Sequence, residues 1–172
     1  MNATCLVVMG VSGAGKSTVA RLLADELGWP MAEADEFHPA SNIDKMSAGV
    51  PLTDEDRAPW LSALRDWITA RAEAGENAVV TCSALKRSYR DILRQAGARV
   101  RFVHLAGPAS VVSERLSSRS GHFMPPSLLA SQFGDLEPLD ATEDGVTVDL
   151  GRSPERIAAS ALTGLGLGTA PE

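Results

Sequence analysis

A glycine-rich loop near the N-terminus constrains the fold of this chain more than any other feature. Residues 10–17 read Gly-Val-Ser-Gly-Ala-Gly-Lys-Ser and fit the pattern G-x-x-x-x-G-K-[ST] completely. An apolar run precedes the loop at residues 5–9, and residues 16–27 carry an apolar stripe with helical spacing. A strand, a glycine loop and a helix in this order form a phosphate-binding loop, because backbone N–H groups and the helix N-terminus together surround an anion. The residues expected to bind the phosphates of a nucleotide are Gly10, Val11, Ser12, Gly13, Ala14, Gly15, Lys16, Ser17 and Thr18.

Short apolar runs alternate with longer amphipathic stretches along the rest of the chain, which predicts an α/β fold. Because only 5% of the residues are aromatic, Ala, Val and Leu must build the core, and such a core suits buried parallel strands between helices. We expect one domain over residues 1–163, with a doubly wound, three-layer, five-stranded parallel sheet, and a flexible tail at residues 164–172. The expected strands are residues 5–9, 31–34, 78–82, 100–105 and 146–150, and the expected helices are residues 16–27, 43–48, 85–96, 109–119 and 127–133, with two more that begin after Thr53 and Ser153.

Charge and cysteine content exclude several classes of protein. The 172 residues include 16 basic and 22 acidic side chains, and the net charge of −6 argues against a nucleic-acid partner. The apolar run at residues 5–9 is too short for a signal peptide or a membrane span, so we expect a cytoplasmic protein without a membrane partner; a homodimer is compatible with the sequence. Cys5 and Cys82 lie in strand-like runs, which predicts buried, reduced thiols rather than a disulfide or a zinc site. Residues 84–101 hold six basic side chains, most of them expected on a solvated helix face.

The phosphate loop alone leaves the reaction open, but other motifs narrow the class. A switch GTPase needs a guanine-reading N-K-x-D, which is missing, and the one D-x-x-G lies on the first helix at residues 25–28. A motor ATPase needs an apolar strand that ends in Asp-Glu, whereas the third expected strand ends in Thr81-Cys82-Ser83. A small-molecule kinase is therefore favoured, with Lys16 as a catalytic group that bridges the terminal phosphates of ATP. A nucleotide-binding regulator without an acceptor site is the alternative from another class.

Two carboxylates at the end of the second expected strand suit the acceptor side of a kinase. Glu33 and Asp35 lie where the carboxyl ends of parallel strands border the ligand crevice. Phosphoryl transfer to a hydroxyl needs a group that orients the acceptor and takes its proton, and Asp35 suits this catalytic role. Glu33 suits a metal site, together with the Ser17 hydroxyl, for Mg²⁺ or its waters. A solvated loop that merely starts with acids is the alternative for both residues.

Longer blocks of sequence resemble the gluconate kinases, a small family of phosphate-loop kinases related in fold to shikimate and adenylate kinases. The resemblance runs from about residue 6 to residue 138 with nearly unbroken spacing. It implies a sheet with strand order 2-3-1-4-5, and ATP-dependent phosphorylation of D-gluconate at its 6-hydroxyl to give 6-phospho-D-gluconate and ADP. The blocks that carry it are Asp35-Glu-Phe-His38-Pro39, Asn42-Ile43 with Lys45-Met46, Asp56-Arg57 with Pro59-Trp60-Leu61, Cys82-Ser83-Ala84-Leu85-Lys86, Tyr89-Arg90-Asp91, Arg115-Leu116 with Arg119, Gly121-His122-Phe123 and Ser131-Gln132-Phe133.

The resemblance also implies roles for individual residues. Asp35 would orient the reactive hydroxyl and Arg57 would bind the substrate, while Glu33 stands where members of the family more often have Asp. Residues about 117–134 would form a mobile lid over ATP, in which an arginine stabilises the charge on the transferred phosphoryl group. Another sugar acid, or shikimate, is the alternative acceptor. The further residues expected to contact the acceptor are His38, Ser83, Lys86 and His122, and those expected to contact ATP are Arg115, Arg119 and Pro154, with Arg119 also catalytic.

Overall fold

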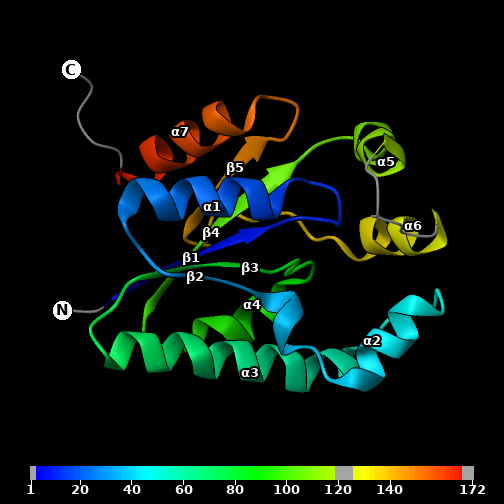
Figure 1. Cartoon of the computed structure of the whole chain (residues 1–172), viewed down its shortest axis with the longest axis horizontal. Coiled ribbons are helices and arrows are strands. Elements are labelled where there is room, and N and C mark those ends of the chain that lie inside the picture. Colours follow the sequence, from blue (N-terminus) through cyan, green and yellow to red (C-terminus); the bar gives the residue numbers. More distant parts are fainter. Residues whose placement is uncertain (1–2, 119–125, 168–172) are drawn as a thin grey trace.

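The computed structural model describes residues 3–118 and 126–167, which form three layers with a parallel sheet in the middle (Figure 1). The strand order is β2-β3-β1-β4-β5, and every neighbouring pair is parallel. This order confirms the predicted α/β fold and its expected sheet. The strands are β1 (Thr4–Met9), β2 (Met31–Glu33), β3 (Ala78–Thr81), β4 (Arg99–Ala106) and β5 (Gly145–Asp149).

Strand β1 lies at the centre of the sheet because both of its faces are apolar. Residues 5–9 are almost completely buried, and Cys5 pairs with Ala78 on one side and with Val100 on the other. Helices α1 (Lys16–Leu27) and α7 (Pro154–Leu165) cover one face of the sheet. Helices α3 (Asp54–Glu73) and α4 (Arg87–Arg94) cover the other face, so the core consists of two layers of aliphatic side chains on either side of the strands (Figure 1).

Three helices gather at the edge to which all five strands point. These are α2 (Ala40–Ser47), α5 (Ala109–Ser118) and α6 (Pro126–Asp135), while the short 3-10 helix η1 (Ala34–Phe37) joins β2 to them (Figure 1). In a doubly wound sheet, ligands bind in the crevice outside the carboxyl ends of the strands. No helix within the described residues is long and apolar enough to cross a membrane.

Most element boundaries differ from the sequence predictions by one to three residues, and three of the differences have a clear structural reason. Helix α2 begins at Ala40, not at residue 43, because Pro39 serves as its N-cap residue in an extended conformation. Helix α4 begins at Arg87, because residues 85 and 86 still belong to the loop after β3. Helix α7 continues to Leu165, so the predicted tail starts too early: Gly164 packs against Val146 so closely that a Cβ atom would come within 2.7 Å of it. Residues 168–172 of that tail lie outside the described residues.

One arginine of the basic segment is not on a solvated face. Arg90 is fully buried and forms an ion pair with Glu143, whose side chain is only 1% exposed. The other basic residues of the segment keep some exposure and pair with surface acids, as Arg99 does with Asp144. The prediction of a solvated face is therefore wrong for Arg90. Sequence analysis could not predict the burial of Arg90, because its partner Glu143 lies 53 residues further along the chain.

The two thiols are expected to be free in the folded protein and slow to react. Cys5 of β1 pairs with Ala78 of β3, and Cys82 lies four residues after Ala78. The two cysteines are therefore offset along the strands by about 13 Å. A disulfide requires Cα atoms within about 7 Å. Both cysteines are buried, and burial raises the pKa of the Cys82 thiol to about 12. Titration with a thiol reagent should detect two thiols in denaturant without reductant and almost none in the native protein; two rapidly reacting native thiols would contradict this packing.

Candidate active site

The phosphate loop connects the end of β1 to the start of α1, as predicted. Gly15 is the N-cap residue of α1 and has φ 97°, a left-handed conformation that favours glycine. Gly10 packs against β4, where a Cβ atom would lie 2.9 Å from the carbonyl oxygen of Leu105. No side chain caps the helix at Gly15, so the backbone N–H groups of its first turn are available to an anion. The loop therefore has the backbone geometry of a phosphate site.

Lys16 lies across this loop. Its ammonium donates hydrogen bonds of 3.0 Å to the carbonyl oxygens of Gly10 and Val11. Burial lowers the pKa of Lys16, while the nearby carboxylates of Asp35 and Glu33 act in the opposite direction. A cation is thus placed between the phosphate loop and the acids at the carboxyl end of β2.

Two oxygen-bearing side chains meet beside the loop. The Ser17 hydroxyl donates a hydrogen bond to the Glu33 carboxylate, although the two residues belong to different elements. Glu33 also forms a capping box with Glu36, whose carboxylate accepts a bond from the Glu33 backbone N–H. These contacts hold the Glu33 carboxylate at the end of β2. Hydroxyl and carboxylate oxygens in this position are ligands that Mg²⁺ prefers.

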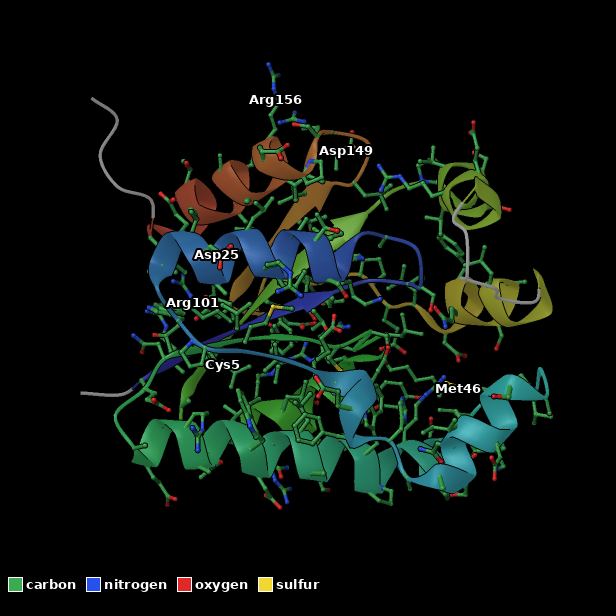
Figure 2. All side chains as sticks on the ribbon, viewed as in Figure 1. Cys5, Asp25, Met46, Arg101, Asp149 and Arg156 are labelled. Atoms are coloured by element: carbon green, nitrogen blue, oxygen red, sulfur yellow. The ribbon has the colours of Figure 1, made fainter. Side chains whose placement is uncertain are left out.

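A cavity of about 310 Å³ lies between the phosphate loop and helices α2, α3 and α6. This volume is at the lower end of the range for small-molecule sites. Lys16, Asp35 and Arg57 contribute to its wall from three different elements, so a cation, a carboxylate and a guanidinium face one space. Met46, labelled in Figure 2, contributes from α2. The complete lining is Ser12, Gly13, Gly15, Lys16, Ser17, Thr18, Asp35, His38, Met46, Pro51, Leu52, Arg57, Trp60, Thr81, Cys82, Ser83, Leu85, Ser131 and Gln132.

Trp60 of α3 fixes the segment that carries Asp35 and His38. Its indole N–H donates a 2.7 Å hydrogen bond to the carbonyl oxygen of Ala34, and its ring stacks on that of His38 with 4.1 Å between centroids. Asn42 of α2 lies within hydrogen-bond distance of the His38 ring, at 3.2 Å. Burial lowers the pKa of His38, which favours the neutral imidazole. The neutral ring can exchange hydrogen bonds with a hydroxyl-rich ligand.

Arg57 enters the cavity from the first turn of α3 and is 9% exposed. Its guanidinium donates a 2.6 Å hydrogen bond to the Tyr89 hydroxyl, which in turn donates to Asp54 at 2.6 Å. Asp135, the last residue of α6, lies 3.5 Å from the same guanidinium. These partners fix the guanidinium fork, whose geometry matches that of a carboxylate.

Lys86 contacts Asp54 and Tyr89 near the larger cavity. Its ammonium donates to Asp54 at 3.2 Å and lies 5.6 Å from the centre of the Tyr89 ring. The neighbouring Leu85, and not Lys86, is among the described residues that line the cavity. A direct contact between Lys86 and the acceptor therefore stays a prediction.

A second cavity, of about 270 Å³, lies on the other side of the phosphate loop, against α7. Arg115 crosses from α5 and donates to the carbonyl oxygens of Ala14 and Leu150, and it thereby joins the loop to the end of β5. Arg152 and Pro154 also line this cavity. The structure thus brings Thr18, Arg115 and Pro154 together beside the phosphate loop.

Gln132 is a site residue to which sequence analysis assigned no role. Its amide oxygen accepts a 2.7 Å hydrogen bond from the backbone N–H of Ser12, and its amide nitrogen donates to the Ser12 hydroxyl at 3.2 Å. The two residues are 120 positions apart, so no local pattern reports the contact. Arg119 and His122, which were expected to act in the lid, lie outside the described residues.

Comparison with known proteins relates this site to a family. A family model described as "AAA domain" matches residues 6–137, which is most of the chain. A gluconokinase from Gluconobacter oxydans is 51% identical over 152 residues, which are 88% of this chain and 85% of that protein. The chain belongs to the gluconokinase family. The resemblance inferred from the sequence blocks is thereby confirmed.

Solved structures agree with this membership. The structure of a gluconokinase from Sinorhizobium meliloti has a TM-score of 0.86 and 48% identity, over 95% of this chain and 91% of that chain. An unliganded sugar kinase from Janibacter has a TM-score of 0.90 and 51% identity, over 98% of this chain and 99% of that chain. The gluconokinase family therefore shares the fold on which this site is built.

Proposed function

We propose that this protein is a gluconokinase, which transfers the terminal phosphoryl group of ATP to the 6-hydroxyl of D-gluconate and releases 6-phospho-D-gluconate and ADP. The observation that carries the proposal is the wall of the larger cavity, where Lys16, Asp35 and Arg57 face one space. Membership of the gluconokinase family supports the choice of acceptor. A regulator that only binds nucleotide has no use for an acid and a carboxylate-binding arginine beside the phosphate loop.

The phosphate loop and Lys16 act on the nucleotide. Backbone N–H groups at the start of α1 hold the phosphates, and the Lys16 ammonium neutralises charge that develops on the terminal groups. The cavity beside α7, between Arg115 and Pro154, has room for the adenosine part. The nucleotide then extends across the loop from the smaller cavity to the larger one.

Asp35 and Arg57 act on the acceptor. Gluconate is an open chain with a carboxylate at one end and a primary hydroxyl at the other, so it needs a carboxylate-binding group and a base at some distance from each other. Arg57 binds the carboxylate with its guanidinium fork, and Asp35 accepts the proton of the 6-hydroxyl as the oxygen attacks phosphorus. His38 and Ser83, which line the same cavity, bind the intermediate hydroxyls.

The residues beside the loop fit a magnesium ion. Mg²⁺ takes one or two protein oxygens, together with water and the phosphates of the substrate. Ser17 and Glu33 offer such a pair, already within hydrogen-bonding distance of each other. Ser17 and Glu33 would hold the ion, which would supply positive charge to neutralise the phosphates. Members of the family more often have Asp where this chain has Glu33, whose side chain is one methylene longer. The longer side chain still contacts Ser17.

The remaining parts of the proposal concern the lid and the setting. Arg119 stabilises the transferred group and His122 contacts the acceptor when a lid over residues about 117–134 closes. The enzyme works in the cytoplasm, where ATP is available and the two buried thiols stay reduced. Its partners are small molecules rather than nucleic acid or membrane, and a homodimer is compatible with this role.

Gluconate is expected to be phosphorylated much faster than glucose, shikimate or AMP in the presence of Mg·ATP. The physical reason is that gluconate alone among them combines an open chain, a carboxylate for Arg57 and a terminal primary hydroxyl for Asp35. A coupled assay of ADP release over a panel of sugar acids measures this preference.

The same assay without an acceptor is the control for slow hydrolysis of ATP. Equal rates with shikimate, or with AMP, would contradict the proposed acceptor. A rate that no acceptor raises above the control would favour a nucleotide-binding regulator.

A further inference from the structure

The loop between β3 and α4 holds an unusual backbone conformation. Ala84 has φ 46°, and among the described residues it is the one non-glycine residue with positive φ. Its side chain is fully buried. An L-residue in the left-handed region is disfavoured by contact between its Cβ atom and the backbone. Such a conformation persists only where the surrounding structure enforces it.

Arg90 supplies the contacts that enforce this conformation. Its guanidinium donates hydrogen bonds to the carbonyl oxygens of Ala84 at 2.8 Å and Leu85 at 3.3 Å. A third bond, of 3.5 Å, reaches the carbonyl oxygen of Pro138. Arg90 is fully buried, so these bonds form away from water; Nη1 makes both bonds to the loop, and Nη2 makes the bond to Pro138.

Glu143 holds Arg90 in place from the opposite side. Its two carboxylate oxygens accept bonds of 2.6 and 2.9 Å from the Arg90 guanidinium. Burial acts to raise the pKa of Glu143, but the hydrogen bonds and charges of Arg90 and Arg94 outweigh it and lower the pKa, so the carboxylate stays charged. The pair fixes the guanidinium plane against the loop.

The loop held in this way forms part of the acceptor site. Ser83 and Leu85, the two neighbours of Ala84, line the larger cavity. The carbonyl oxygen of Ser83 also accepts a bond of 3.3 Å from the N–H of Gly10, at the start of the phosphate loop. The Leu85 carbonyl oxygen accepts a bond of 2.7 Å from Glu137, just after α6. A change in the backbone conformation of Ala84 therefore moves the wall of the cavity, while the first turn of α1 keeps its own bonds.

We propose that Arg90 is a positioning residue for the acceptor: held by Glu143, it keeps Ala84 in the left-handed conformation and thereby places Ser83 and Leu85 against the sugar acid. Arg90 does not line the cavity and touches no reacting group. Its effect is on the binding of the acceptor rather than on the nucleotide. This inference rests on the proposed function.

The variant Arg90→Lys tests the role because lysine keeps the positive charge but ends in a single nitrogen, whereas the guanidinium bonds Glu143 through Nε and Nη2 and the loop carbonyls through Nη1. We expect the KM for gluconate to rise about tenfold. This factor corresponds to the free-energy cost of holding Ala84 in the left-handed conformation, which the bonds of Arg90 no longer offset. The KM for ATP should change less than about threefold, since the first turn of α1 is not altered. Arg94→Lys is the matched control, because Arg94 also bonds Glu143, at 3.3 Å, but does not reach the loop.

Rescue by glycine separates positioning from general stability. Glycine adopts positive φ without the penalty, so Ala84→Gly added to Arg90→Lys should recover most of the lost gluconate affinity. Ala84→Gly alone should stay close to the wild type. A folded Arg90→Lys with unchanged gluconate KM, or a double variant without recovery, would overturn the proposal. If Arg90→Lys does not fold, Glu143→Gln carries the same test, with a smaller increase in KM and the same rescue.

A measurement without substrate keeps this inference distinct from the proposed function. Hydrogen exchange at residues 83–86 should be faster in Arg90→Lys than in Arg94→Lys, whichever acceptor the enzyme uses. Equal exchange in the two variants would contradict the positioning role. Absence of gluconate phosphorylation by the wild type would instead contradict the proposed function.

Discussion

Replacing Lys16 with alanine is expected to lower kcat by at least about 10²-fold, the effect of removing one preorganised donor from a developing negative charge. The Lys16 ammonium already lies across the phosphate loop, 3.0 Å from two of its carbonyl oxygens, so little reorganisation precedes its contact with phosphate. The fold should survive the change, because the side chain is partly exposed. Steady-state ADP release at saturating gluconate and ATP measures the loss.

Arg71→Ala is a suitable control for the loss of a cation. Arg71 lies at the far end of α3 and pairs with Glu76 on the surface. Its removal should leave the protein folded, since an exposed ion pair contributes only about 0–1 kcal/mol to the free energy of unfolding. The kcat should therefore stay close to that of the wild type. A Lys16→Ala enzyme that retains most of its kcat would show that the loop backbone binds the phosphates without help from this side chain.

Asp35→Asn should lower kcat by about 10²-fold or more while ATP binding stays nearly intact, because asparagine keeps the shape of the side chain but cannot take the hydroxyl proton. Asp35 follows β2 in η1, a segment tied to α3 through Trp60, so the amide should occupy the place of the carboxylate. Single-turnover kinetics measure the loss in the chemical step, and calorimetric titration with a nucleotide measures ATP binding.

Asp25→Asn provides the matched control. Asp25 lies on α1, on the surface and away from the helices that surround the larger cavity (Figure 2). Its replacement should change neither kcat nor the affinity for ATP. If Asp35→Asn keeps more than about a tenth of the wild-type kcat, near the low end of general-base contributions, Asp35 is not the proton acceptor.

Patterns that are local in sequence predicted the elements that act through their backbone. The phosphate loop can be recognised in the sequence because its glycines and the helix N-terminus must be consecutive residues. The continuous apolar run at residues 5–9 predicted a strand, and β1 is almost completely buried in the middle of the sheet. Asp35 and Arg57 were expected to meet through family resemblance, and both line the larger cavity.

Contacts between distant segments could not be predicted in the same way. A buried arginine such as Arg90 has the same local sequence as a solvated one, because only its remote partner Glu143 makes burial tolerable. Gln132 likewise sits in an ordinary helical stretch, and its bond to Ser12 exists only in the folded chain. Helix ends moved by a few residues because tertiary contacts, such as that of Gly164 with Val146, extend or shorten the local pattern.

The central position of β1 also determines when the site can assemble during synthesis. Thr4–Met9 is synthesised before both of its partners in the sheet, which are Ala78–Thr81 and Arg99–Ala106. This buried strand therefore has no partner until Thr81 has been synthesised, and its second partner is complete only at Ala106. Long-range pairing of this kind folds slowly and leaves hydrophobic surface open to aggregation or to chaperones. The phosphate loop, although it is synthesised well before β4, acquires its fixed shape only when Gly10 packs against Leu105 of β4.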